Sequence, residues 1–106
     1  MIITEEEFQN MKSPIDEDQF VGVMIKHIAT IKESQDHKYT KEINLMRWGK
    51  LENALFPLID IRSWEVNKRG EKIPGKGITL SRSEMQDVIK ELSNIENNKE
   101  LKRMLK

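Results

Sequence analysis

Residues 58–92, LIDIRSWEVNKRGEKIPGKGITLSRSEMQDVIKEL, decide the fold that we expect for this chain. The stretch opens with apolar Ile59 and Ile61 alternating with charged or aromatic residues, a period of two that is typical of a strand with one apolar face. Arg62 and Trp64 lie two residues apart, so in a strand their side chains point to the same face. A guanidinium beside an indole on an open sheet face suits a flexible polyanion whose bases stack, as in single-stranded nucleic acid.

The rest of this stretch predicts a loop, a short strand and a helix. Residues 67–75 are rich in Lys, Arg and Gly, residues 72–77 read as a basic turn, and residues 77–80 as a short strand. Ser81 with Glu84 three residues later is a capping box that begins a helix. One apolar stripe follows at helical spacing, and it packs under the sheet or across a dimer interface: Met85, Val88, Ile89, Leu92 and Ile95.

Upstream, residues 20–32 and 39–48 predict a long antiparallel hairpin, and residues 57–66 a third strand. Residues 20–32 fit helical spacing as well as strand spacing, but Gly22 and many β-branched residues favour a strand. Near the start, Thr4 and Glu7 form a capping box for a short helix that should end by Ser13-Pro14. The predicted class is therefore α+β, with a four-stranded antiparallel sheet, one following helix and a short N-terminal helix.

Composition limits the possible functions. The 106 residues suffice for one domain, and the absence of cysteine excludes disulfides and cysteine-bound zinc. His27 and His37 have no further ligands at metal spacing, and no nucleophile–base pair or phosphate-binding glycine loop is present, so we expect neither a cofactor nor an enzyme. The longest apolar-leaning run, residues 20–31, contains charged residues and is too short to span a bilayer, and the acidic start does not resemble a signal peptide.

The net charge of zero hides an uneven distribution. Residues 1–20 carry six acidic residues and one lysine, so the remaining 86 residues carry a net charge of +5. The chain therefore divides into an acidic leader (1–19), a basic domain (20–95) and an amphipathic C-terminal tail (96–106). This asymmetry favours a polyanionic partner, although a solvated surface of mixed charge is the commoner origin of such patterns.

Three pieces in order resemble a known family: residues 41–44 followed by Trp48, then residues 60–64, then PGKGITLS at residues 74–81. Over residues 23–95 the chain is similar to the single-stranded-DNA-binding transcriptional coactivators of the positive cofactor four family, most closely to their bacterial and phage relatives. The resemblance implies a curved four-stranded sheet with one helix and a homodimer with the helices near its two-fold axis. The dimer contacts expected from it are Met85, Val88, Ile89 and Leu92.

The resemblance also implies a DNA-binding surface on the sheet, with Trp48, Arg62 and Trp64 on its face. The full set of expected contacts is Lys41, Arg47, Trp48, Lys50, Arg62, Trp64, Lys72 and Lys76. Residues 52–56 lengthen one connection relative to the family, which leaves the placement of Arg47 and Lys50 open. Trp64 has the alternative of lying in the core, and a bulge would move Trp48 to the other face.

The expected function is therefore a homodimeric, largely sequence-independent single-stranded-DNA-binding protein that acts in transcription, replication or recombination. Whether RNA or melted duplex binds as well stays open. The alternative is an interaction module that recruits polymerase or replication proteins through the acidic leader and the tail. No membrane partner is expected. The expected location is intracellular, in the bacterial cytoplasm or nucleoid or in the cytoplasm of a phage-infected host.

Overall fold

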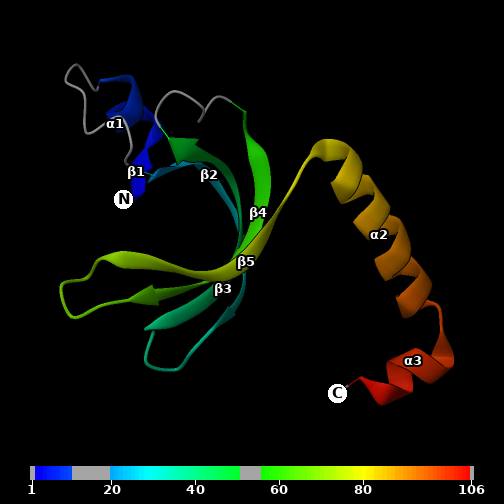
Figure 1. The fold of residues 1–106 in the computed structure, drawn as a ribbon. Coiled ribbons are helices and arrows are strands. Elements are labelled where there is room, and N and C mark those ends of the chain that lie inside the picture. Colours follow the sequence, from blue (N-terminus) through cyan, green and yellow to red (C-terminus); the bar gives the residue numbers. More distant parts are fainter. Residues whose placement is uncertain (1, 11–19, 51–55, 106) are drawn as a thin grey trace.

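The computed structural model describes residues 2–10, 20–50 and 56–105, and it has an α+β architecture built on one curled sheet (Figure 1). The five strands, which lie side by side in chain order, are β1 (Ile2–Thr4), β2 (Phe20–Glu33), β3 (Tyr39–Lys50), β4 (Leu58–Val66) and β5 (Lys72–Leu80). The three helices are α1 (Glu5–Gln9), α2 (Arg82–Glu96) and α3 (Lys99–Met104). The predicted α+β class is confirmed.

The sheet is mixed and has one strand more than we expected. Strands β2 to β5 pair antiparallel with their chain neighbours, but β1 pairs parallel with β2, with Ile3 opposite Val23. A three-residue strand at a sheet edge carries no alternation long enough to detect, which is why the sequence showed only the helix that follows it. α3 is likewise a second C-terminal helix in what we expected to be an amphipathic tail.

Strand β2 explains why its sequence fits both helix and strand spacing. Its pairing with β3 is interrupted by three register shifts, and each shift skips one isoleucine: Ile25, Ile28 and Ile31. A bulge adds one unpaired residue and bends the strand, so a bulge every three residues turns the alternation of a strand into a spacing of three. The predicted strand is therefore confirmed, and the helix-like spacing has a structural cause in the bulges.

The predicted basic turn at residues 72–77 is wrong, because these residues belong to β5. The loop is shorter, with Gly70 at a positive φ of 78°. Strand β5 lies at the edge of the sheet, where Pro74 needs no partner for its missing N–H. Gly77 lies so close to β4 that a Cβ there would stand 2.1 Å from the Cβ of Arg62.

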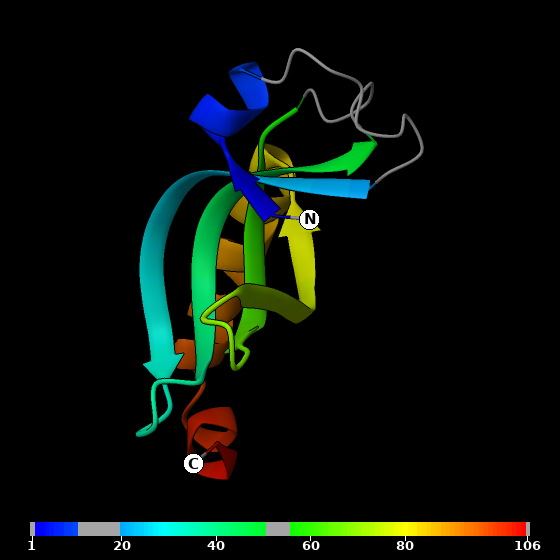
Figure 2. The ribbon, with the colours of Figure 1, turned by 90° about the vertical axis from the view of Figure 1, so that its left-hand side faces the viewer.

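Helix α2 begins as predicted. The Ser81 hydroxyl accepts from the Glu84 N–H at 3.2 Å, and the Ser81 N–H donates to the Glu84 carboxylate at 2.9 Å. The helix contacts β4 and β5, and it lies on the outer side of the curled sheet (Figures 1 and 2). Among the described residues its apolar stripe is only partly covered, because Ile89 and Leu92 are 54% and 57% exposed. The radius of gyration of 16.5 Å accordingly exceeds the ~13 Å typical of a compact domain of about this length.

The acidic leader takes part in the fold. Its Thr4 capping box is confirmed, and Phe8 of α1 packs against a small core of Ile3, Val21 and Val23. α1 ends at Gln9, with Asn10 as its C-cap, which is before the predicted limit at Ser13-Pro14. Residues 11–19 and most of the lengthened connection at 52–56 lie outside the described residues. Within the described ranges, no helix has the length and apolar character needed to cross a membrane.

Candidate nucleic-acid interface

The two tryptophans lie together on the inner face of the curled sheet, which we call the concave face. The ring centroids of Trp48 on β3 and Trp64 on β4 are 6.4 Å apart, with 23° between the ring planes. Arg62 shares this face, as the alternation predicted. The face is not open at Trp64, however, because that side chain is only 1% exposed, as the alternative core interpretation predicted.

Arg62 and Asp60 form a fixed unit with Trp48. The Arg62 guanidinium carbon lies 4.5 Å from the centroid of the Trp48 ring. Arg62 Nε donates to both Asp60 carboxylate oxygens at 2.7 and 2.8 Å, and Nη2 lies 2.6 Å from Oδ2. Asp60, which is fully buried, also accepts from the Trp48 indole N–H at 2.9 Å. This carboxylate therefore positions both the guanidinium and the indole.

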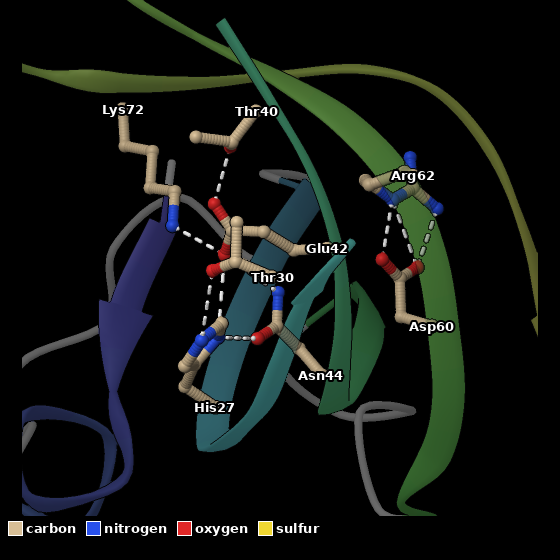
Figure 3. A network of polar contacts seen from close by, with 8 residues as sticks. All are labelled: His27, Thr30, Thr40, Glu42, Asn44, Asp60, Arg62 and Lys72. Carbon is tan, nitrogen blue, oxygen red and sulfur yellow. Dashed lines mark hydrogen bonds and ion pairs between the residues drawn. The ribbon is translucent and has the colours of Figure 1, made fainter. Parts of the chain in front are cut away.

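Lys72 and Glu42 form a similar unit with Trp64. Lys72 Nζ lies 5.1 Å from the Trp64 ring centroid and 2.6 Å from Glu42 Oε1. The buried Glu42 carboxylate also accepts from the Thr40 hydroxyl and, at 3.3 Å, from the Asn44 amide (Figure 3). Burial raises the pKa of Glu42, but the hydrogen bonds from Lys72, Thr40 and Asn44 and the charge of Lys72 outweigh burial and lower it below its usual value.

A chain of hydrogen bonds leads from β2 to the Glu42 carboxylate (Figure 3). His27 Nδ1 lies 2.7 Å from the Asn44 amide oxygen, which can only accept, so Nδ1 carries the proton and donates. His27 Nε2, 3.2 Å from the Thr30 hydroxyl, can then accept from it. Each group in the chain is thereby satisfied, and His27 Nδ1 is also 3.4 Å from Glu42 Oε1.

A pocket of about 420 Å³ opens beside Trp48 and Arg62. Residues from all five strands line this pocket, which places it on the inner side of the curled sheet. They are Ile2, Gly22, Trp48, Arg62, Pro74, Gly75 and Thr79. Gly22 makes room for the indole, because a Cβ there would lie 2.4 Å from a Trp48 ring carbon. The volume falls within the range of about 300–1,000 Å³ that is usual for ligand pockets.

The structure does not bring all the predicted cations to this face. Lys41 and Arg47 lie at odd positions of β3 and point to the opposite face from Trp48. Arg47 is bound there by Glu5 of α1 at 2.6 Å. Lys76 is exposed on β5 at the irregularity opposite Ser63, with no ion pair to any described residue. The side chain of Lys50 lies outside the described part of the structure.

Sequence reasoning missed the two carboxylates that organise the face. Glu42 lies an even number of residues from Trp48 on β3, and Asp60 lies two residues from Arg62 on β4. The alternation of the strands therefore did place both carboxylates on this face. Their burial was not foreseen, because acidic residues are rarely buried unless they are paired. Among the described residues, no group of three or more His, Asp or Glu side chains could hold a metal ion.

Comparisons with protein-family models, with curated proteins and with solved structures gave no match for this chain. The resemblance to the coactivator family therefore stays a prediction from the sequence.

Proposed function

We propose that the chain is a single-stranded-DNA-binding protein that receives unpaired bases on the concave face. One observation carries this proposal. Trp48 and Trp64 stack side by side, and each has a cation over its ring, Arg62 at 4.5 Å and Lys72 at 5.1 Å. We call these four residues the cation–indole cluster. Aromatic platforms interleaved with cations are the means by which proteins bind unpaired strands without reading their sequence.

The shape of the surface supports an unpaired strand as the ligand. Bases in a duplex already stack on one another, and only an unpaired strand can turn a base into the pocket beside Trp48. Base–aromatic stacking is worth roughly 1–3 kcal/mol per base, so stacking on the half-buried Trp48 would supply a substantial part of the affinity.

We also propose that the protein is a homodimer through the uncovered stripe of α2. Ile89 and Leu92 are more than half exposed, and Met85 and Val88 are half-buried. An apolar stripe of this kind on a helix indicates a partner surface. The role in transcription, replication or recombination rests on the family resemblance.

The experiment is fluorescence anisotropy of a labelled strand of about 20 nucleotides, titrated with the protein and competed with unlabelled duplex at two salt concentrations. Replacing Trp48 with alanine should weaken binding about 5- to 150-fold at both salt concentrations, which corresponds to the loss of one stacked base. The matched control is Tyr39→Ala, an exposed aromatic on the opposite face of β3, which should leave the affinity unchanged. Equal losses in the two variants, or no binding of the wild type, would refute the proposal.

The phosphate contribution is tested separately through Lys76. Lys76→Gln should lower the salt slope by about 0.7, the value for one phosphate of a single strand. Lys90→Gln, which removes an exposed lysine from α2, is the matched control and should leave the slope unchanged. Deleting residues 1–20 would not be a clean test of the leader, because it also removes β1 and α1 from the fold.

A further inference from the structure

The two cations of the cation–indole cluster are anchored differently. Arg62 makes three contacts with Asp60, its Nη1 also donates to the Gly75 carbonyl at 3.2 Å, and its side chain is only 15% exposed. Lys72 makes a single contact with Glu42, and its side chain is 39% exposed. A guanidinium held by several bonds is fixed, whereas an ammonium on a flexible four-carbon stem can leave its partner. Lys72 is therefore the movable member.

Trp64 lies beneath this movable lysine and lacks an acceptor. Lys72 Nζ lies over its ring, and the indole N–H is buried without a hydrogen-bond partner among the described residues. A buried donor without an acceptor is unfavourable, and the indole of Trp48 avoids this state by donating to Asp60. Trp64 thus has an unused donor, and the cation over its ring is the movable one.

We propose that the Lys72–Glu42 ion pair is a movable cover over Trp64. In the free protein Lys72 pairs with the Glu42 carboxylate, and in the complex it pairs with a phosphate of the bound strand instead. When a strand binds, Lys72 turns from Glu42 to the phosphate, a base stacks on the exposed Trp64 ring, and the indole N–H gains an acceptor. The contact is autoinhibitory, because the free protein pairs this lysine internally. This inference rests on the proposed function and explains how a side chain that is 1% exposed can serve as a stacking platform.

Glu42 can lose its lysine because it keeps other donors. The Thr40 hydroxyl and the Asn44 amide still donate to it. A carboxylate with these hydrogen bonds tolerates the departure of its cation far better than an isolated buried charge would. The donors around Glu42 therefore make the exchange reversible.

The first test is a double-mutant cycle with Glu42→Gln and Lys72→Gln. In the wild type, the lysine exchanges one anion for another, so Lys72 adds little to the salt slope. Glu42→Gln should tighten binding of the strand about three- to tenfold and steepen the slope by about 0.7, because one more phosphate then gains an unpaired cation. In the double variant, which lacks the lysine, Glu42→Gln should give no gain in affinity or slope over Lys72→Gln alone.

The second test uses the wild-type protein, so it does not depend on whether the Glu42→Gln variant folds. The two indole N–H resonances are followed by NMR during titration with an oligothymidylate. The Trp64 signal should shift strongly as its N–H gains an acceptor, while the Trp48 signal moves less because Asp60 retains it.

The outcomes separate the two proposals. Absence of binding by the wild type refutes the proposed function. Wild-type binding with an unmoved Trp64 resonance, or a folded Glu42→Gln variant that binds with wild-type affinity and slope, leaves the proposed function standing and overturns the cover.

Discussion

Removing the Asp60 carboxylate should be among the most destabilising single changes in the chain. Asp60 is fully buried, it binds the guanidinium of Arg62, and it accepts from the Trp48 indole. Asp60→Ala leaves a mostly buried cation without its counter-ion, a loss of about 3–5 kcal/mol in comparable pairs. The free energy of unfolding of a typical domain is about 5–15 kcal/mol, so this one change removes a large share of it.

The assay is urea unfolding at a fixed protein concentration, followed by circular dichroism so that altered indole fluorescence does not mislead. In thermal unfolding at the same protein concentration, about 4–8 °C per kcal/mol corresponds to a fall of roughly 12–40 °C in the midpoint. Asp87→Ala, an exposed acidic residue on α2, is the control and should stay within about 0.5 kcal/mol of the wild type. Adding Arg62→Met to Asp60→Ala should restore much of the loss, since it removes the unpaired charge. A loss below about 1 kcal/mol for Asp60→Ala would refute the reasoning.

Three further predictions concern backbone space, capping and pH. Gly77→Ala should destabilise the protein by about 1–3 kcal/mol in the same unfolding assay, because its Cβ meets the β4 backbone, with the Ile61 carbonyl oxygen 2.4 Å away. Ser81→Ala should cost about 1 kcal/mol and lower the helical signal of α2, and unchanged thermal unfolding would contradict the capping role. Folding lowers the pKa of Glu42, so its ionised carboxylate contributes to the free energy of unfolding. This contribution is fully present above the unfolded pKa of about 4.3, and it is lost as the pH falls through the lower folded pKa. The stability difference between wild type and Glu42→Gln should therefore shrink below about pH 4, and a pH-independent difference would exclude this linkage.

Local sequence signals were sufficient for three of the five strands, with β-branched residues deciding β2 where the spacing was ambiguous. The predicted strands at 20–32, 39–48 and 57–66 match β2, β3 and β4 to within two residues at each end. Strand β5 was underestimated because its Pro and Gly residues are typical of turns, and only pairing with β4 holds them in a strand. Propensity carries no information about a tertiary partner, so the ends of such an edge strand cannot be predicted from it.

The sequence predicted which side chains of the candidate site share a face of the sheet, but it did not predict how exposed that face is. A period of two suffices to place Arg62 and Trp64 on one face. Whether that face is open depends on how strongly the sheet curls, and the three bulges in β2 contribute to the curl. Each bulge is defined by a register against β3, a long-range property that the spacing of Ile25, Ile28 and Ile31 only hints at.

The charges buried in the concave face determine what kind of binding to expect. The two carboxylates, Glu42 and Asp60, neutralise the two cations of the cation–indole cluster, so these four charged groups sum to zero. A neutral platform does not attract phosphates from a distance, and the chain as a whole has a net charge of zero. Under the proposed function, we therefore expect the affinity to come mainly from stacking, with a shallow salt slope set by exposed lysines such as Lys76. A slope worth many phosphates would instead indicate that the strand follows another surface, for example the face that carries Lys41.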